Sequence, residues 1–285
     1  MTAQALYPDA DGVLHPHPLG LVECSNDEYH RGPGISKSHL DKIAGASPRH
    51  YWHHYLNPDR VREEPTPAMV LGSAIHSAIL EPDLFPLEYV ADPGINRRTN
   101  AGKAEYEAFV AENAGKTVLN DEQMQTCLAV RDAVHLHPVA AGLLQGGAAE
   151  QSFYAIDPET GELIKCRTDY LAGDLIVDVK STEDASPDGF GKSAANFRYP
   201  MQVAWYHDVM NAAFGEHPPH WVFLAVEKKP PYAVGLYFTE PDVVQRARLA
   251  CRRDLMRIVK HKRSGQWPDY GAEALPLNLP PWWKA

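Results

Sequence analysis

The sequence predicts an α/β (α+β) fold with a helical N-terminal half and a strand-rich second half. Between residues 34 and 147, apolar side chains recur every three or four positions, which is the spacing of amphipathic helices. After residue 147 apolar and polar residues alternate, as in strands that bury one face. These patterns divide the chain into an irregular lead-in (1–33) and a single domain (34–285), which comprises a helical part (34–147), a strand-rich core (148–240), and a basic helix with a tail (241–285).

Composition excludes several classes of protein. No apolar run approaches the roughly 20 residues of a membrane-spanning helix, so no membrane partner is expected. Residues 1–20 lack an apolar core, so no signal peptide is expected and the protein is predicted to be cytoplasmic. The cysteines, Cys24, Cys127, Cys166 and Cys251, form no CxxC pair, which argues against a zinc ribbon or an iron–sulfur cluster. The formal net charge of -10 argues against non-specific coating of nucleic acid.

The helical part contains two segments with functional potential. Residues 49–55 combine aromatic and basic side chains, which fits either a packed helix with exposed imidazoles or a nucleic-acid contact by stacking. A strongly apolar helix is expected at residues 68–82, where His76 is the one imidazole. On this helix alone, His76 is either a hydrogen-bonded core residue or a ligand. Further helices are expected after the N-cap Ser36 and at residues 103–113 and 121–135. A short strand is expected at residues 88–91.

The strand-rich part places charged residues at one end of a hairpin. A three-stranded meander is expected, formed by residues 150–156, 162–171 and 174–180, with a Gly-Asp turn between the last two strands. Asp169 lies on the second strand, while Asp178 and Lys180 lie two apart on the third and project from the same face. Buried charges of this kind are costly unless they are paired or hold a metal.

Three more elements are expected toward the C-terminus: a helix at 197–214, a hairpin at 221–238 and a long helix at 241–264. Gln202 and Tyr206 are four residues apart and share one face of the first helix. The long helix keeps an apolar stripe and a basic outer face, which is either simply solvated or directed at phosphates. Residues 267–285, rich in Pro and Trp, are expected to lie along the surface.

The charged hairpin matches the requirements of phosphodiester hydrolysis. That reaction needs a nucleophilic water, counter-charge for the transition state, and help for the leaving oxygen. Carboxylates that bind one or two Mg²⁺ ions supply the first two, and a lysine beside the metal orients the water or offsets charge. Asp169, Asp178 and Lys180 match this set in type and spacing. These three residues alone would also fit a pair of surface strands joined by a salt bridge. The motifs around them are therefore needed to distinguish a nuclease site from such a pair.

Five ordered motifs resemble the RecB-type branch of the PD-(D/E)xK nuclease superfamily. They are a helical Gly72-x-x-x-His76, Glu150, Asp169, Asp178-x-Lys180 and a helical Gln202-x-x-x-Tyr206. A narrower resemblance is to the RecE-like exonucleases, typified by the C-terminal domain of exodeoxyribonuclease VIII. It rests on Gly34-Ile-Ser-Lys-Ser-His-Leu, on Ser47-Pro-x-His50-Tyr-Trp, on the residues from Pro67 to His76, and on Trp267-Pro followed by Leu-Pro-Pro-Trp282. The similarity extends from about residue 34 to residue 283.

The resemblance implies a restriction-endonuclease-like core, with a central mixed sheet flanked by helices. The implied metal ligands are His76, Asp169, Asp178 and the Val179 carbonyl. Lys180 becomes the catalytic lysine, Glu150 binds or orients the metal–water shell, and two further residues support the lysine and the phosphate, Gln202 and Tyr206. The implied cofactor is Mg²⁺, with Mn²⁺ also suited to a His among oxygen ligands, and no iron–sulfur cluster is expected.

The resemblance also implies a function and partners. RecE-like proteins degrade linear double-stranded DNA from its ends in the 5′-to-3′ direction, and leave a 3′ single strand for a RecT-like annealing protein. The family forms a ring-shaped homotetramer around DNA and occurs mainly in phage recombination systems. Three alternatives stay open: a single-strand-specific or CRISPR-adaptation-like nuclease of the RecB branch, a non-catalytic DNA-binding scaffold, and an unrelated metal-binding module.

Overall fold

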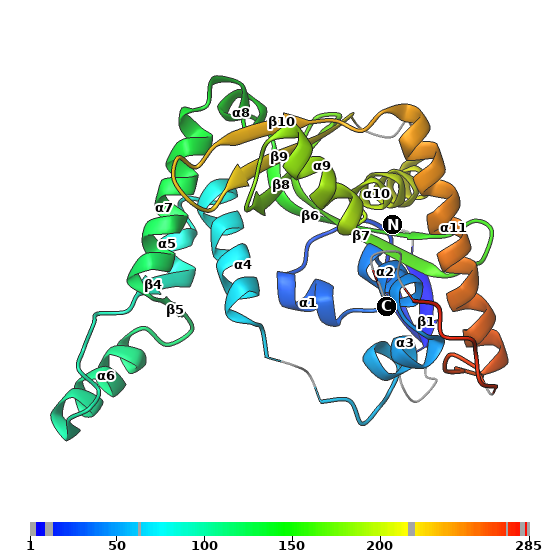
Figure 1. Ribbon diagram of the computed structural model, residues 1–285, viewed down its shortest axis with the longest axis horizontal. Helices are drawn as coiled ribbons and strands as arrows, with labels where there is room; N and C mark the ends of the chain where they lie inside the picture. Colours follow the sequence, from blue (N-terminus) through cyan, green and yellow to red (C-terminus); the bar gives the residue numbers. More distant parts are fainter. Residues whose placement is uncertain are drawn as a thin grey trace.

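Figure 1 shows the computed structural model of the chain, which describes residues 4–8, 14–61, 64–215, 220–271, 273–279 and 283. Among these residues, a mixed sheet of six strands forms the centre, in the order β10–β9–β8–β7–β6–β3. β8 and β9 run parallel, and the other neighbours run antiparallel. The strands are β3 (Gly20–Val22), β6 (Ala148–Ile156), β7 (Leu163–Ala172), β8 (Leu175–Thr182), β9 (His220–Glu227) and β10 (Val234–Tyr237). The predicted α/β fold with a central mixed sheet is therefore confirmed.

The parallel pair depends on the long connection between β8 and β9. Parallel neighbours need a crossover, and here the chain crosses through α9 (Pro187–Asn196) and α10 (Tyr199–Phe214). The sequence predicted a helix at 197–214 but not α9. α9 carries ordinary start signals, because the Ser186 side chain accepts a hydrogen bond from the Gly189 N–H and Pro187 is the first helical residue.

Helices cover both faces of the sheet. Ile176 of β8 packs with Val203 of α10 on one face, and its neighbour Val177 packs with Ile75 of α4 on the other. Strands that are buried on both faces are typical of sheets with parallel pairs. α2 and α11 pack behind α10, whereas α7 packs beside α4. These helices are α2 (Lys37–Gly45), α4 (Pro67–Leu80), α7 (Asp121–Leu136) and α11 (Pro241–Ser264).

The prediction of an irregular lead-in at residues 1–33 is wrong for the part that the structure describes. The lead-in contains β1 (Gln4–Pro8), paired with β2 (Leu14–Pro18), then the edge strand β3 and α1 (Asn26–Arg31). The buried ammonium of Lys165 on β7 holds this segment, because it donates hydrogen bonds to the carbonyls of Tyr29 at 2.5 Å and Gly32 at 2.7 Å. A contact between residues so distant in sequence leaves no local pattern. Residues 1–3 and 9–13 lie outside the described part.

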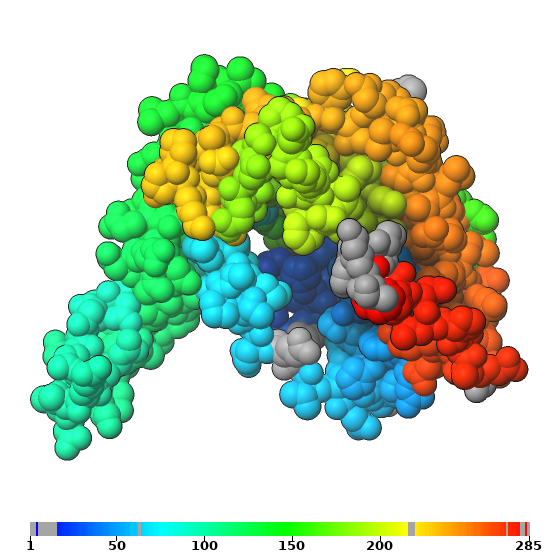
Figure 2. Space-filling view, viewed as in Figure 1, coloured from blue at the N-terminus to red at the C-terminus, as the bar shows by residue number. Residues whose placement is uncertain are grey.

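An arm projects from the helical part of the chain. β4 (Tyr89–Ala91) follows α5 (Phe85–Glu88) and pairs in parallel with β5 (Thr117–Leu119). Between the two strands, α6 (Asn100–Glu112) extends away from the sheet (Figure 1) and stands out in the space-filling view (Figure 2). The sequence predicted a strand at 88–91 and a helix at 103–113. It did not predict β5, whose three residues are too few for a recognisable period.

Two short helices and the C-terminal tail complete the described fold. α8 (Pro138–Leu143) follows α7, and α3 (Pro48–Tyr55) follows α2. The tail lies against α3, because Trp267 stacks on Tyr51 with ring centroids 5.4 Å apart and the Arg49 N–H donates to the Pro268 carbonyl. Within the tail, residues 272, 280–282, 284 and 285 lie outside the described part. Among the helices that the structure describes, none is both long and apolar enough to span a bilayer.

Candidate metal centre and active site

Three structural elements bring potential metal ligands together. His76 comes from α4, Glu150 from β6 and Asp169 from β7, and their ligand atoms all lie within 4.8 Å of one another. His76 Nδ1 is 3.5 Å from Asp169 Oδ2. All three side chains are half-buried. An imidazole with two carboxylates suits a divalent cation such as Mg²⁺ or Mn²⁺. The structure thus places Glu150 directly among the candidate ligands.

The backbone is unusual at the point where β6 and β7 contribute these carboxylates. The pairing runs from Ala149–Tyr170 to Gln151–Thr168 and skips Glu150 and Asp169. Glu150 also adopts a left-handed conformation, with φ of 54°. Such a conformation costs a non-glycine residue of order 1–3 kcal/mol and is concentrated at functional sites. Arg167 helps to hold the side chain, with its Nε 2.6 Å from Glu150 Oε2.

Asp178 and Lys180 lie beside this cluster on β8. Asp178 is fully buried. Its Oδ1 accepts a hydrogen bond from Gln202 Nε2 of α10 at 2.5 Å, and its Oδ2 forms an ion pair with the Lys180 ammonium. The Val179 N–H donates to Asp169 Oδ2 at 2.8 Å, and the Val179 backbone also interacts with the His76 imidazole. Val179 therefore connects the ligand cluster to the Asp178–Lys180 pair.

Burial shapes the electrostatics of the site. It raises the pKa of both Asp169 and Asp178 to about 6, although the nearby charge of Lys180 opposes the rise. Burial lowers the pKa of His76, and the Lys180 charge lowers it further. Burial would also lower the pKa of Lys180, but Asp178 and Asp169 together raise it above its usual value. The site therefore concentrates carboxylates that are costly to ionise without a strong counter-charge.

These residues fit a divalent cation. Bound cations favour ionised carboxylates and a neutral imidazole, which is the protonation state that burial favours for His76. In addition, Asp178 Oδ2 is buried, and its partner among the residues that the structure describes is the Lys180 ammonium. An oxygen with lone pairs to spare is a suitable cation ligand. The compact ligand set contains His76, Asp169 and Glu150, with Asp178 turned toward Gln202.

Tyr206 occupies a different environment from the other predicted site residues. Its ring packs edge-to-face on Trp221, with centroids 5.4 Å apart, at the junction of two apolar clusters. Within the described part of the chain, no hydrogen bond joins Tyr206 to Asp178 or Lys180. Its predicted support of the lysine and phosphate stays a prediction.

Two residues that sequence reasoning missed support the site. Arg167 contacts Glu150 and donates to Ser152 Oγ at 2.5 Å. It precedes Asp169 by two positions on the same strand, so the period of a strand could have identified it. Tyr199 begins α10, and its ring centroid is 5.0 Å from the Lys180 ammonium, within the range of a cation–π interaction. No sequence motif indicated this contact.

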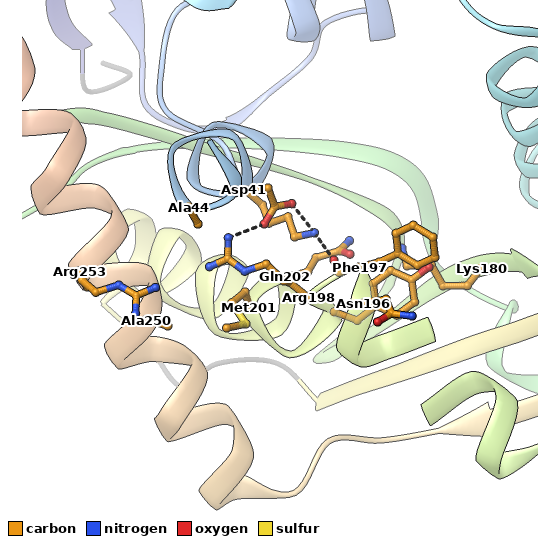
Figure 3. A pocket seen from close by; sticks show the side chains of 13 residues that line it. Asp41, Ala44, Lys180, Asn196, Phe197, Arg198, Met201, Gln202, Ala250 and Arg253 are labelled. Carbon is orange, nitrogen blue, oxygen red and sulfur yellow. Dashed lines mark hydrogen bonds and ion pairs between the residues drawn. The ribbon is translucent and has the colours of Figure 1, made fainter. Parts of the chain in front are cut away.

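A basic cavity of about 850 Å³ opens beside Lys180 and Gln202 (Figure 3). It lies between α2, α10 and α11, with Lys180 and Phe197 toward one end and Arg253 toward the other. In the space-filling view, the surface is also hollowed between α4 and the α9–α10 region (Figure 2). The cavity lining carries four cationic side chains against a single carboxylate, Asp41; the cations are Lys37, Lys180, Arg198 and Arg253. Each of these cations also pairs with a carboxylate, so their charge is partly offset; the carboxylates are Asp41, Asp178 and Asp254.

Outside this cavity, the basic face of α11 is largely neutralised within the molecule. Arg248 Nε is 2.7 Å from Asp208 Oδ1, Arg252 pairs with Asp157 and Glu159, and Lys262 pairs with Glu162. These ion pairs favour the interpretation of a structural, solvated helix face over a phosphate-facing one. The aromatic and basic segment 49–55 likewise forms a packed helix, as the stacking of Tyr51 on Trp267 shows.

Comparisons with known proteins agree with this geometry. The sequence model of the family described as "PDDEXK-like domain of unknown function (DUF3799)" matches residues 36–276. A crystal structure described as "Putative exonuclease", from Eubacterium rectale, superposes with a TM-score of 0.62 at 13% identity, over 90% of this chain and 97% of that chain. An alkaline exonuclease from Laribacter hongkongensis matches at 11% identity over 68% of this chain and 97% of that chain, with a TM-score of only 0.26, too low to support an argument.

The comparisons establish the family and the fold. No curated protein matches the chain. At 13% identity, the Eubacterium rectale structure supports the fold alone. The predicted PD-(D/E)xK core is confirmed, because the family match and the superposition both cover most of the chain. This protein belongs to the family of PDDEXK-like domains matched over residues 36–276.

Proposed function

We propose that this protein is a metal-dependent exonuclease that hydrolyses linear double-stranded DNA from its ends, in the 5′-to-3′ direction. One observation carries the proposal: the cluster of His76, Glu150 and Asp169 meets the Asp178–Lys180 pair at the edge of a cation-lined cavity. Hydrolysis of a phosphodiester needs this combination of metal ligands and positive charge. The exonuclease-like PDDEXK fold supports the same reaction class.

The chain's own residues have distinct parts in this reaction. His76, Glu150 and Asp169 would hold a divalent cation, either Mg²⁺ or Mn²⁺, which would supply Lewis-acid chemistry at the scissile phosphate. Lys180 places a positive charge at the mouth of the cavity, where it stabilises the charge that develops on the phosphate. Gln202 fixes the orientation of Asp178, which in turn holds Lys180.

The polarity, the product and the partners of the proposed reaction rest on the motif resemblance. A 5′-to-3′ exonuclease leaves a 3′ single strand, which a RecT-like annealing protein uses in recombination. A homotetrameric ring would keep the enzyme on its DNA, and its channel would present basic residues while the outer surface stays acidic. The basic cavity in an acidic chain supports such a distribution of charge.

A nuclease assay tests the proposal directly. Linear duplex, nicked circular duplex and single-stranded DNA are incubated with Mg²⁺, with Mn²⁺ or with EDTA. We expect degradation of the linear duplex with either metal and none with EDTA, and we expect Asp169→Asn and Lys180→Ala to abolish it while circular dichroism stays unchanged. Duplexes labelled at one end then decide polarity. Degradation that starts at the 3′ end, or that is confined to single strands, contradicts the proposed reaction.

A further inference from the structure

Phe197 is an exposed aromatic residue next to the proposed catalytic lysine. It lies in the short link between α9 and α10 and lines the basic cavity together with Lys180 and Tyr199. The residue is 62% exposed. Single exposed apolar side chains are common on protein surfaces, but Phe197 combines its exposure with a place in the cavity lining beside Lys180.

The backbone around Phe197 is held in place from several directions. The Phe197 N–H donates to the Ser193 carbonyl at 2.9 Å, and its carbonyl accepts a hydrogen bond from Lys37 Nζ at 2.8 Å. The next residue, Arg198, adopts a left-handed conformation with φ of 55°. The Arg198 guanidinium is anchored to Asp41 at 3.1 Å and to buried Asp254 at 2.5 Å. The exposed ring is thus presented by a segment that has little freedom to move.

A layer of aromatic rings connects Phe197 with Lys180. The Phe197 and Tyr199 rings stack with centroids 5.8 Å apart and planes at 21°, and the Tyr199 ring is 5.0 Å from the Lys180 ammonium. Phe190 also contacts Tyr199, with ring centroids 5.8 Å apart and planes at 37°. A ring that is rigid, exposed on one side and backed by a second ring is suited to stack on a planar ligand.

The cavity beyond Phe197 suits a chain of phosphates. Arg253 lies toward its far end, and the Arg253 side chain is 65% exposed even though it contacts Asp254 (Figure 3). Apolar side chains from three helices, Ala44, Met201 and Ala250, line the space between. Proteins that bind single-stranded nucleic acid without sequence preference combine these two features, an aromatic stacking surface and a positively charged groove.

We propose that Phe197 is a base-stacking platform that holds an unpaired nucleobase of the DNA strand beside Lys180, while Arg253 contacts a phosphate farther along the same strand. The ligand class is a single-stranded DNA segment of any sequence, because every base offers a flat face. Phe197 acts as a positioning residue: it places the strand so that a phosphate reaches the metal centre. This inference rests on the proposed nuclease function and extends it to the form in which the substrate enters the site.

Binding of a single-stranded oligothymidylate that carries one 2-aminopurine tests the platform. In EDTA, where no strand is cut, we expect the wild-type protein to quench the fluorescence of the stacked base. Phe197→Ala and Phe197→Leu should abolish this quenching and weaken binding by about 5- to 150-fold, the cost of one lost base–aromatic stack. Phe197→Trp should restore both. Phe238→Ala is the matched control, since Phe238 is 71% exposed and does not line this cavity.

The outcomes separate this inference from the proposed function. The platform would be overturned if Phe197→Ala and Phe197→Leu both kept quenching and affinity within about twofold of the wild type. Losses in Phe238→Ala as large as those in the Phe197 variants would overturn it as well. Failure of Phe197→Trp to restore quenching would also overturn it. If the wild type cuts no DNA under any metal condition but Phe197→Ala still loses quenching, the nuclease proposal fails and the stacking site stands. Thermal unfolding of each variant confirms that the compared proteins are folded.

Discussion

At the scale of single residues, Asp178 shows how the candidate site is held together. It is fully buried, and its two oxygens contact Gln202 and Lys180. A buried carboxylate keeps its charge only where such partners remain, because an unpaired buried charge is strongly destabilising. Gln202 is thus as important for the orientation of this carboxylate as Lys180 is for its charge.

Replacement of Gln202 tests this role. Gln202→Leu keeps the approximate volume and removes the hydrogen bond to Asp178, so the carboxylate and Lys180 lose their fixed orientation. We expect activity on linear duplex, or affinity for Mg²⁺, to fall by roughly 10- to 100-fold, as is usual when a partner of a metal-site residue is removed. Steady-state kinetics over a Mg²⁺ titration measure both quantities. Gln245→Leu, an exposed glutamine on α11, is the control and should behave as the wild type.

Lys165 supports a prediction about pH and stability. Its side chain is buried against Tyr29 and Gly32, and burial lowers its pKa to about 8. The folded state therefore binds fewer protons than the unfolded state between pH 8 and the ordinary pKa of 10.5. Stability should rise with pH across this window, because the cost of burying the charge disappears, by up to about 3 kcal/mol from this residue.

The buried thiol of Cys127 and the hydroxyl of Tyr29 have raised pKa values because of burial, and these act in the opposite direction. The informative quantity is therefore the difference between the wild type and Lys165→Met. Urea unfolding at pH 7.5 and at pH 10 measures it. The wild type should gain stability relative to the variant as the pH rises; an unchanged difference would show that the Lys165 pKa is not lowered in the folded protein.

At the scale of elements, the sequence revealed those whose signals are local. The hairpin of β7 and β8 was predictable because alternation and a Gly-Asp turn lie within one stretch, and Gly173 indeed has a left-handed φ of 60°. The crossover between β8 and β9 was not predictable, because the parallel pairing of these strands depends on where α9 and α10 pack. The contact of Arg167 with Glu150 could have been inferred, whereas that of Tyr199 with Lys180 depends on how α10 enters the site.

The lead-in also shows that contacts between distant parts of the chain could not be predicted from local sequence. Its anchoring bonds connect Lys165 with Tyr29 and Gly32, more than 130 positions away in sequence. The five ordered motifs indicated which side chains would converge, and His76, Glu150 and Asp169 do so. They could not indicate the left-handed backbone of Glu150, because only the packing around β6 imposes it.

The helix α11 supports a prediction about DNA binding at this scale. Most of its cations are engaged in ion pairs, and Arg253 also pairs with Asp254, but the Arg253 side chain is 65% exposed and lines the basic cavity. We expect Arg253→Ala to weaken DNA binding and to reduce the slope of log K against log salt by roughly 0.7–0.9, which corresponds to one phosphate contact. Fluorescence anisotropy with labelled DNA over a salt series measures the slope. Lys260→Ala, an exposed lysine on the same helix outside the cavity, should leave the slope unchanged.

At the scale of the whole molecule, the distribution of charge matters more than its sum. The chain carries a net charge of -10, yet four cations line the cavity beside the candidate metal ligands. On the proposed function, DNA would be repelled by most of an acidic surface and would enter at this cavity, because screening limits each field to about 10 Å at 0.1 M salt.

The predicted ring assembly belongs to this scale. If four subunits surround the DNA, light scattering coupled to size-exclusion chromatography should give four times the chain mass of 31.7 kDa. The projecting helix α6 offers surface for contacts between subunits, since it extends away from the rest of the chain (Figure 1). Removal of its exposed apolar side chain in Val110→Glu should shift the assembly toward smaller species. A monomeric wild type would contradict the ring.

The short strands at the two borders of the central sheet limit how copies of the molecule can associate. β3 has three residues and β10 has four, so each border offers few unpaired backbone groups to a neighbouring strand. Short edge strands are a common protection against edge-to-edge aggregation. The borders of the central sheet are therefore poorly suited to continue the sheet from one copy into the next. If copies of the chain associate through side chains of their helices, point substitutions on that surface should dissociate them and leave the central sheet intact.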